Sequence, residues 1–352
     1  MIQPGRGGSS FSLATINRLA GFWGIDQQLE PGCFIANTMY EINAWLKIAD
    51  YNGTIVSCDP FNFYQGLKSF CPVILIKDPA NDRYKMEVRS ASTVGPFDNT
   101  GWNHVYGLVT MTETMLTWPS LVFYIGWGRA NINLIIDDIS IKPADRNTYG
   151  IPTCTQLIRN GNAEVGDARF WFIRGKGAVA NNGFAEDAGS IQIVPGDKEN
   201  GSSYAFHHKG PRSLMRHGMW QDLDMSCMPI NTKWKISAKI RLLDMNDNGK
   251  QCIKLIVGGP TAYGEYGCPI FRLEAYYENY TNYHYRNLLN QNTDIWNATG
   301  WNKYEHLFVM DESLSSRQLI YLFIHGVMPM DTYMVDDISV TPVDDISVTP
   351  MY

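Results

Sequence analysis

The sequence is short of concentrated positive charge and of long apolar runs, and each shortage argues against a class of protein. It has 29 Lys and Arg residues against 35 Asp and Glu residues, and no basic run. Nucleic-acid binders need clustered Lys and Arg to neutralise phosphates, so a phosphate-binding surface is not expected. No apolar stretch approaches the roughly 18 residues of a membrane-spanning helix. The opening MIQPGRGGSSFSL also lacks the charged and apolar regions of a signal peptide.

Catalytic and metal-binding motifs are equally scarce. The 7 histidines show no HExxH spacing, and GSS at 201–203 is not the G-x-S-x-G of a nucleophile elbow. Adjacent Asp336 and Asp337 point to opposite faces of a strand, so they cannot flank one glycosidic bond as the carboxylates of a glycoside hydrolase do. We therefore expect no catalysis in this chain, while a catalytic domain in a missing N-terminal part stays open.

Sustained helical periodicity is missing, whereas strand periodicity is frequent. In WKISAKIRLLD at 234–244, apolar and polar residues alternate, as in a strand with one buried face. LIYLFIH at 319–325 is a continuous apolar run, which suits a strand buried on both sides. Gly, Asn, Asp and Pro turns separate these strands. The pattern predicts an all-β chain of antiparallel β-sandwiches or jelly rolls.

The chain contains two copies of one unit. NTGWN at 99–103 matches ATGWN at 298–302, and IIDDIS at 135–140 matches MVDDIS at 334–339, both at an offset of 199 (298 − 99 and 334 − 135). Upstream, YEINAWLKIAD at 40–50 matches WKISAKIRLLD at 234–244, an offset of 194 (234 − 40). Loops that gain a few residues explain the growing offset. We predict a first sandwich over 1–143, a linker over 144–154 and a complete second sandwich over 155–342.

The first copy is expected to lack its front. The second copy begins near Thr155, and subtracting 194 places the matching start before Met1. The missing signal peptide would then say nothing about localisation. The phrase VDDISVTP occurs at 335–342 and again at 343–350. Because no new domain precedes the second occurrence, we interpret 343–352 as a duplicated tail whose deletion leaves stability unchanged.

Seven cysteines fit four per complete copy with one partner missing. Four cysteines in one copy allow three pairings. We favour Cys154–Cys227 and Cys252–Cys268 in the second copy, with Cys58–Cys71 in the first and Cys33 unpaired. The alternative is seven reduced thiols in a cytosolic protein. The triplets at Asn52, Asn200, Asn279 and Asn297 match the glycosylation pattern, so we predict a secreted glycoprotein.

Four motifs in order carry a family resemblance. LIRNGNAE, RHGMWQDL, TGWN and YMVDDISV resemble the carbohydrate-binding modules of families four, nine and twenty-two, which are galactose-binding-like β-sandwiches. The resemblance covers 155–342 and about 10–143. It implies non-catalytic binding of a polysaccharide or glycan, with avidity from two tandem sites, and an extracellular matrix or cell-wall partner. The alternatives are an extracellular structural or adhesion protein without sugar binding, and an accessory segment of a glycoside hydrolase.

The resemblance also implies a structural Ca²⁺ that joins the first strand to the last. Its ligands would be Glu164 in the opening motif and Asp336 or Asp337 in the closing one, together with backbone carbonyls. From the residues alone, Asp336 shares the inward parity of Ile338, and an aspartate that accepts backbone amides is an equally good interpretation. In the first copy only the closing aspartates remain, so metal binding there is doubtful.

Sugar binding in such modules relies on aromatic faces and on Arg, Gln or Asn side chains. A core position is favoured over sugar contact for Trp102, Trp301 and Trp171, whereas for Trp220 and Trp296 the two positions are equally favoured. The tyrosine-rich run at 273–287 is either a binding-loop decoration or a partner surface. The candidates for sugar contact are Trp171, Arg174, Arg216, Trp220 and Trp296 in the second copy, and Arg18, Trp23 and Phe97 in the first.

Overall fold

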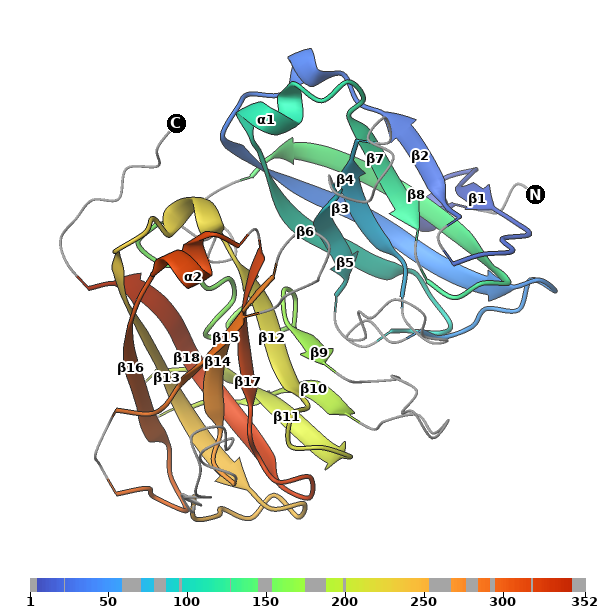
Figure 1. Ribbon diagram of the computed structural model, residues 1–352. Helices are drawn as coiled ribbons and strands as arrows, with labels where there is room; N and C mark the ends of the chain where they lie inside the picture. Colours follow the sequence, from blue (N-terminus) through green and yellow to red (C-terminus); the bar gives the residue numbers. More distant parts are fainter. Residues whose placement is uncertain are drawn as a thin grey trace. The chain divides into compact units, whose positions relative to one another are not determined.

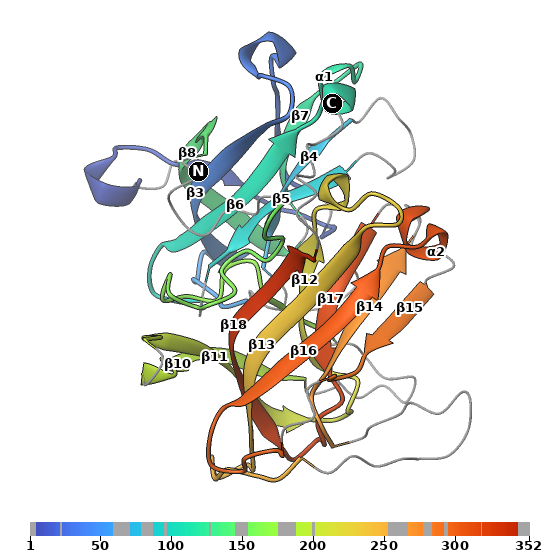
Figure 2. The same ribbon diagram turned by 90° about the vertical axis from the view of Figure 1, so that its left-hand side faces the viewer.

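The chain folds into two compact units, Met1–Asp145 and Arg146–Tyr352, each built almost wholly of antiparallel strands (Figures 1 and 2). No helix among the residues that the structure describes is long and apolar enough to cross a membrane. The computed structural model describes residues 5–21, 23–58, 71–78, 87–94, 97–126, 128–144, 154–174, 188–198, 201–252, 267–276, 284–291, 295–317 and 319–343.

The first unit is one continuous sheet in the order β1-β8-β3-β6-β5-β4-β7-β2. Apolar residues of β3, β6 and β8 pack against those of β4 and β7 in one core, so the sheet closes on itself as a sandwich. The elements are β1 (Leu13–Thr15), β2 (Ile25–Gln28), β3 (Thr38–Asp50), β4 (Val73–Lys77), β5 (Glu87–Thr93), β6 (Asn103–Met111), α1 (Glu113–Leu116), β7 (Val122–Gly126) and β8 (Ile132–Pro143), with short 3-10 turns at Arg6–Gly8 and Pro31–Cys33.

The second unit is a sandwich of two five-stranded sheets, β10-β11-β18-β13-β16 and β15-β14-β17-β12-β9, which face each other in both ribbon views (Figures 1 and 2). The expected all-β architecture is confirmed. Its elements are β9 (Phe172–Arg174), β10 (Ala188–Pro195), β11 (Tyr204–Arg212), β12 (Gly218–Leu223), a 3-10 turn at Met225–Cys227, β13 (Lys233–Leu243), β14 (Ile270–Tyr276), β15 (His284–Leu288), β16 (Asn302–Val309), α2 (Glu312–Ser315), β17 (Leu319–His325) and β18 (Thr332–Pro342).

Strand alternation sets the core as the sequence predicts. In β13, Trp234, Ile236 and Ile240 are fully buried, while the intervening Lys235 and Lys239 reach carboxylates at the surface. In β17, burial continues on both faces of the strand: Leu322 and Phe323 are both buried. The first face belongs to the core, and the second is the outer face that is described below.

The register of the strands fixes which residues of the two units are equivalent. Ile25 pairs with Ile125 in the first unit as Met219 pairs with Ile324 in the second, so β2 matches β12 at an offset of 194 and β7 matches β17 at 199. Gly24 and Gly218 agree, because a Cβ on either would overlap the carbonyl of the paired strand. Among the described residues, the first unit has no strand equivalent to β9 or β10.

The repeated DDIS motif is a β-bulge in both units. The register slips between Asn43 and Trp45 opposite β8, and between Ser237 and Lys239 opposite β18. The second aspartate of each pair has a positive φ of about 50°, 50° in Asp138 and 49° in Asp337, a conformation that Asp tolerates better than most residues. The motif therefore recurs because the bulge needs a short polar residue at this point.

The favoured disulfides are confirmed. Cys58–Cys71, Cys154–Cys227 and Cys252–Cys268 are bonded, and Cys33 is free and exposed. The predicted linker and the duplicated tail lie mostly outside the described residues. Of the tail, Val343 is described, and its backbone N–H donates to the Lys233 carbonyl at 3.0 Å.

Candidate functional site

The outer face of the sheet that contains β12, β14 and β17 carries two rows of polar and aromatic side chains. In the first row, the register places Asn287, Arg272, Phe323, Trp220 and Phe172 on five adjacent strands. In the second row, it places Tyr285, Glu274, Tyr321 and Asp222 on four strands. Side chains of one row stand on the same side of the sheet because the pleat has a period of two.

The aromatic half of this face is built around Trp220. Its ring meets Tyr321 edge-on at a centroid distance of 4.6 Å and lies 5.0 Å from Phe172. Trp220 is half-buried, whereas Phe172 is buried. Ring packing thus fixes the Trp220 side chain while leaving part of it accessible, which is the property that a stacking platform requires.

The polar half of the face is a network centred on Arg272. Its Nε donates to Asn287 Oδ1 at 2.8 Å, and its guanidinium lies 3.4 Å from Glu274 Oε1 and 4.7 Å from the Tyr285 ring centroid. Arg272 and Glu274 are both buried. A buried arginine that a carboxylate, an amide and a ring hold in place is a rigid hydrogen-bonding group with its charge compensated.

The remaining carboxylate on the face is also paired. Asp222 lies 2.6 Å from Arg159 Nη2, and in the second row Tyr321 stands between Asp222 and Glu274. The face therefore offers rings, amides and compensated charges. Such groups recognise hydroxyls and apolar C–H faces better than they recognise a charged ligand.

One residue predicted from the sequence, Trp220, is the centre of this face. Arg174 ends β9, where its backbone pairs with Gly218, and its side chain lies outside the described part. Arg216 is exposed in the turn before β12. Sequence reasoning missed Arg272, Phe323 and Tyr321, because only the strand register brings β14, β15 and β17 beside Trp220. From the 273–287 run, expected to be a binding-loop decoration or a partner surface, Glu274, Tyr285 and Asn287 lie on this face in strands β14 and β15.

Trp171 is corrected from a sugar-contact candidate to a core residue. It is 1% exposed, its Nε1 donates to the Asn160 carbonyl at 3.2 Å, and its ring packs on Phe206. Trp171 lies directly before β9, and its neighbours Phe170 and Phe172 are buried as well. No ring face of Trp171 is left for a ligand.

Arg18 is likewise corrected to a structural residue. It is 1% exposed and donates to the carbonyls of Trp23, Gly21 and Arg129. Burial lowers the pKa of Arg18 to about 10. Its equivalent at the 194 offset is Arg212, which is also buried and likewise donates to loop carbonyls.

Trp23 is not the equivalent of Trp220. At the offset that the register fixes, Trp220 is equivalent to Asp26, and Trp23 is equivalent to His217. Trp23 is 46% exposed, and it precedes β2 in the chain. Arg18 and Trp23 keep the spacing of Arg212 and His217, so the tryptophan of the first unit stands before the strand and not within it.

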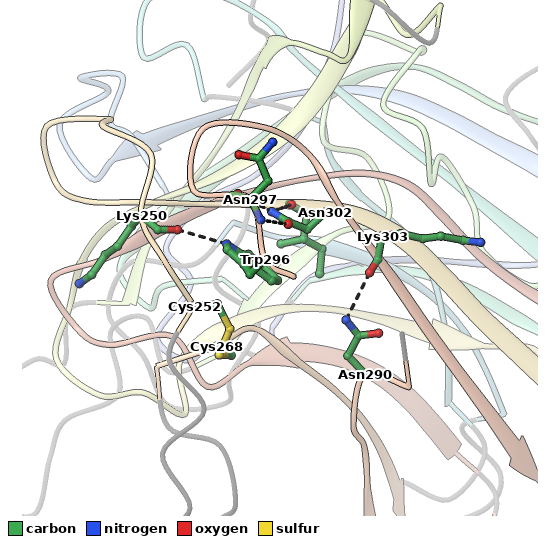
Figure 3. The surroundings of a disulfide bond; sticks show 9 residues. Lys250, Cys252, Cys268, Asn290, Trp296, Asn297, Asn302 and Lys303 are labelled. Carbon is green, nitrogen blue, oxygen red and sulfur yellow. Dashed lines mark hydrogen bonds between the residues drawn. A yellow bond between two sulfur atoms is a disulfide. The ribbon is translucent and has the colours of Figure 1, made fainter. Parts of the chain in front are cut away.

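Trp296 and Phe97 anchor equivalent loops. Trp296 is half-buried, its Nε1 donates to the Lys250 carbonyl at 3.1 Å, and its ring lies beside the Cys252–Cys268 disulfide (Figure 3). Phe97 packs against the core of the first unit. Both lie in the loop before a strand, not on the face described above. Their packing favours an anchoring role over sugar contact.

The equivalent face of the first unit has a different chemistry. Val73, Leu75, Val122 and Tyr124 form a buried apolar cluster there. Leu75 stands at the position of Arg272 and Tyr124 at that of Phe323. Lys77 covers the Tyr124 ring, with its Nζ 3.5 Å from the centroid. Among the described side chains, this face has no tryptophan at the position of Trp220 and no arginine at the position of Arg272.

The residues expected to hold Ca²⁺ fit it in part. Asp336 is fully buried; its Oδ1 accepts from Asp337 N at 2.7 Å, and its Oδ2 has no hydrogen-bond partner in the described part of the chain. Burial raises the pKa of Asp336, against the opposing influence of Ser202. Ser202 Oγ in turn donates to Glu164 Oε1 at 3.1 Å. The orphaned buried oxygen of Asp336 suits a hard cation, whereas Glu164 Oε1 also accepts from the backbone N–H groups of Ser203 and Tyr204 at 2.7 and 3.0 Å.

Asp337 is corrected from a candidate ligand to a surface residue. Its positive φ turns the side chain outward, where it pairs with Lys239 at 2.8 Å. In the first unit, Arg6 occupies the closing aspartates: its backbone N–H donates to Asp137 Oδ2 at 2.7 Å and its guanidinium to Asp138 Oδ2 at 2.9 Å. Among the described residues, no group of three or more His, Cys, Asp or Glu side chains is arranged around a metal position.

No family model and no curated protein matches the chain. Among solved structures, it is similar to the tandem CBM22-1–CBM22-2 domains of Paenibacillus barcinonensis Xyn10C, with 16% identity over 95% of this chain and 87% of that one and a TM-score of 0.38. The CBM22-2 xylan-binding domain of that protein has 16% identity, coverages of 54% and 99%, and a TM-score of 0.36. TmCBM61 in complex with β-1,4-galactotriose has 13% identity, coverages of 53% and 98%, and a TM-score of 0.28.

Proposed function

We propose that the chain is a non-catalytic glycan-binding protein whose site is the outer face of β12, β14 and β17 in the second unit. One observation carries the proposal: Trp220, which is half-buried and packed against neighbouring rings, lies on the same sheet face as the Arg272–Glu274–Asn287 network. An indole stacks on the apolar C–H face of a pyranose, and the fixed polar groups bind its hydroxyls.

The charge pattern favours a neutral glycan. Glu274 compensates Arg272, and Arg159 compensates Asp222. An acidic sugar would need an uncompensated cation, and each described cation on the face already has a carboxylate beside it. The glycan class that fits is therefore a chain of uncharged pyranoses, such as a β-glucan, xylan or mannan.

The same pairing argues against hydrolysis at this face. A glycoside hydrolase needs one carboxylic acid with a raised pKa and a second carboxylate across the bond. Glu274 and Asp222 each lie in an ion pair with an arginine, and Tyr321 stands between them in the row. The two carboxylates therefore do not face each other across an open position, as the pair of a glycoside hydrolase does.

One site per chain follows from the difference between the two units. The equivalent face of the first unit has Leu75 in place of Arg272 and Asp26 in place of Trp220, and an apolar cluster occupies it. Duplication has kept the fold, whereas among the described side chains the combination of Trp220 with the Arg272 network stands only in the second unit. The avidity expected from two sites is replaced by a single binding face.

A structural Ca²⁺ in the second unit is part of the proposal. Glu164 and Asp336 would hold it, with Ser202 beside them, and the ion would neutralise the buried Asp336 carboxylate. It would thereby fasten the opening segment of the unit to β18. The three disulfides support an oxidising, extracellular location, where the partner would be a cell-wall or matrix polysaccharide.

Retention on polysaccharides tests the proposal against a purely structural or adhesive role. The full chain is run through native gels that contain soluble β-glucan, xylan or mannan, and is mixed with insoluble chitin. We expect retention by at least one polymer and its loss in Trp220→Ala. The matched control is Trp23→Ala, which removes an exposed tryptophan from the first unit and should be retained like wild type. Failure of the wild-type chain to bind any of these polymers would refute glycan binding.

A further inference from the structure

The last strand of each unit has the same sequence motif but a differently covered edge. In the second unit, residues 156–161 run along β18: Leu157 N–H donates to the Val340 carbonyl at 3.0 Å, and Ile338 N–H donates to the Gly161 carbonyl at 2.9 Å. In the first unit, β1 covers β8 only over residues 134–136. No strand in the described part of the chain pairs with Ile139 or Ile141 on that edge.

The exposure of equivalent side chains reflects this difference. Ile139 is 37% exposed, whereas its equivalent Ile338 is 2% exposed. Ile141 is half-buried, whereas Val340 is fully buried. Two apolar side chains that are buried in the second unit are thus more exposed in the first. The cost of exposure favours a segment that covers them.

The backbone N–H and C=O groups on this edge of β8 point toward the position that such a segment would take. Ile141 pairs with Ile42 as Val340 pairs with Ile236. Because the N–H and C=O of Val340 point away from β13 toward residues 156 and 157, those of Ile141 point to the open side. An unpaired edge of this kind is a template for an added strand.

A glutamine beside this edge is placed to grip a backbone. In the second unit, Gln221 is fully buried and holds Arg159 by both its groups: Oε1 accepts from Arg159 N at 2.8 Å, and Nε2 donates to the Arg159 carbonyl at 2.9 Å. Its equivalent in the first unit is Gln27, which is exposed. Gln27 can therefore make the same pair of hydrogen bonds to the backbone of a segment in the first unit.

A free cysteine marks where the covering segment would begin. Cys227 closes a 3-10 turn and bonds Cys154, which precedes residues 156–161. Cys33 closes the equivalent turn in the first unit, with its N–H bonded to the Glu30 carbonyl as that of Cys227 is to Asp224. Cys33 is free and exposed. It stands where a partner cysteine is found in the other copy.

We propose that the first unit docks an extended, cysteine-bearing polypeptide segment along β8 and forms a disulfide with it through Cys33. We call Gln27, Cys33, Ile139 and Ile141 the open edge. The occupant has the chemistry of residues 154–161, CTQLIRNG. The occupant is a different segment from residues 154–161 themselves, because the second unit holds those residues by their own disulfide and hydrogen bonds.

The occupant must carry glycine at the position of Gly161. A Cβ there would lie 2.0 Å from the Ile338 carbonyl oxygen in the second unit, which is far inside van der Waals contact. The equivalent oxygen of the open edge belongs to Ile139. A single methyl group at this position therefore separates a matched segment from a mismatched one.

Disulfide formation is a thiol–disulfide exchange in the proposed test. The Cys33 thiolate attacks the peptide sulfur of a peptide–glutathione mixed disulfide, the old sulfur–sulfur bond breaks, and glutathione leaves as its thiolate. The proton that Cys33 lost on ionising balances the one that glutathione takes up. No net oxidation occurs, so the equilibrium reports how well the open edge holds the peptide.

The test measures that equilibrium on the full chain. The CTQLIRNG peptide, its Gly161→Ala form and a scrambled form with the same cysteine are each exchanged in a glutathione buffer, and mass spectrometry locates the adduct. We expect the matched peptide to form the Cys33 adduct with an equilibrium constant about tenfold or more above either control. Hydrogen exchange at the Ile139 and Ile141 amides should slow only in that adduct. Gln27→Ala should reduce the preference, whereas Asp26→Ala, on the opposite face of β2, should keep it.

Two results would overturn the proposal. The first is an equal adduct constant for all three peptides with no protection at Ile139 and Ile141, which would make Cys33 an ordinary exposed thiol. The second is a Cys33–Cys33 dimer that prevails in the presence of the matched peptide, which would make a second copy the occupant. The peptide comparison is made on the wild-type chain, so it does not depend on the folding of any variant.

Discussion

At the scale of single residues, the decisive property is which face of a strand a side chain takes. Trp171 lies just before β9 and Trp220 lies within β12, yet one is in the core and the other is on the outer face. Alternation within β9 and β12 does not reveal which face is covered by the second sheet. The sequence identified both tryptophans as candidates for sugar contact. Which of them lies on the outer face depends on the pairing of β12 with β17.

Arg212 and Arg216 allow a test of how burial decides the role of an arginine, through the unfolding free energies of their variants. Arg212 is buried and donates to the carbonyls of Met328 and Asp331, while Arg216 is exposed. Replacing Arg212 by Leu leaves buried carbonyls unsatisfied and should cost about 3 kcal/mol of unfolding free energy. Arg216→Leu should change it by less than about 0.5 kcal/mol. Denaturant unfolding of both variants checks this, and equal effects would contradict the assignment of Arg212 as structural.

The cap of α2 gives a pH-dependent prediction. Burial works to raise the pKa of Asp311, but hydrogen bonds from Ser313, Arg286 and the Leu314 N–H outweigh it and lower the pKa to about 2. A carboxylate whose pKa is lower in the folded state than in the unfolded state stabilises the fold at pH values above the unfolded-state pKa. This contribution to stability is lost as the pH falls toward 2. Wild type should therefore exceed Asp311→Ala in stability by about 1 kcal/mol at pH 6. The difference should vanish near pH 2. A gap that persists at pH 2 would exclude ionisation of Asp311 as its source.

At the scale of elements, the closing strand shows what a motif can and cannot predict. The repeated DDIS marked the last strand of each unit, and the inward parity of Asp336 is confirmed by its burial. The bulge that turns Asp337 outward could not be predicted, because it depends on the register with β13. The same motif consequently meets an arginine in the first unit and a nearby hydroxyl and carboxylate in the second.

Calcium removal should act on one unit only. EDTA should lower the melting temperature of the second unit by several degrees, because the ion binds the folded state and stabilises it by mass action. Asp336→Asn should abolish the response to calcium. Asp137→Asn, at the equivalent position in the first unit, should leave the response intact. Calorimetry before and after verified calcium removal measures this, and identical thermograms for wild type would count against the ion.

At the scale of the whole molecule, duplication has produced two sandwiches with different surfaces. The offsets between repeats and the cysteine pattern allowed the fold class, the disulfides and the strand equivalences to be predicted from the sequence. The change to an apolar face in the first unit could not be predicted from the sequence, because it depends on which alternate residues of β4 and β7 face outward. One unit carries the proposed glycan site, and the other carries the open edge.

The central claim is a single glycan site on the outer face of the second unit, and titration calorimetry tests it most directly. A soluble oligosaccharide from the retained polymer is titrated into the full chain, into Trp220→Ala and into Tyr124→Ala, which removes the ring at the equivalent face of the first unit. The account predicts one oligosaccharide per wild-type chain, at least tenfold weaker binding in Trp220→Ala, and unchanged binding in Tyr124→Ala. Two oligosaccharides per chain, or binding that survives Trp220→Ala, would contradict it.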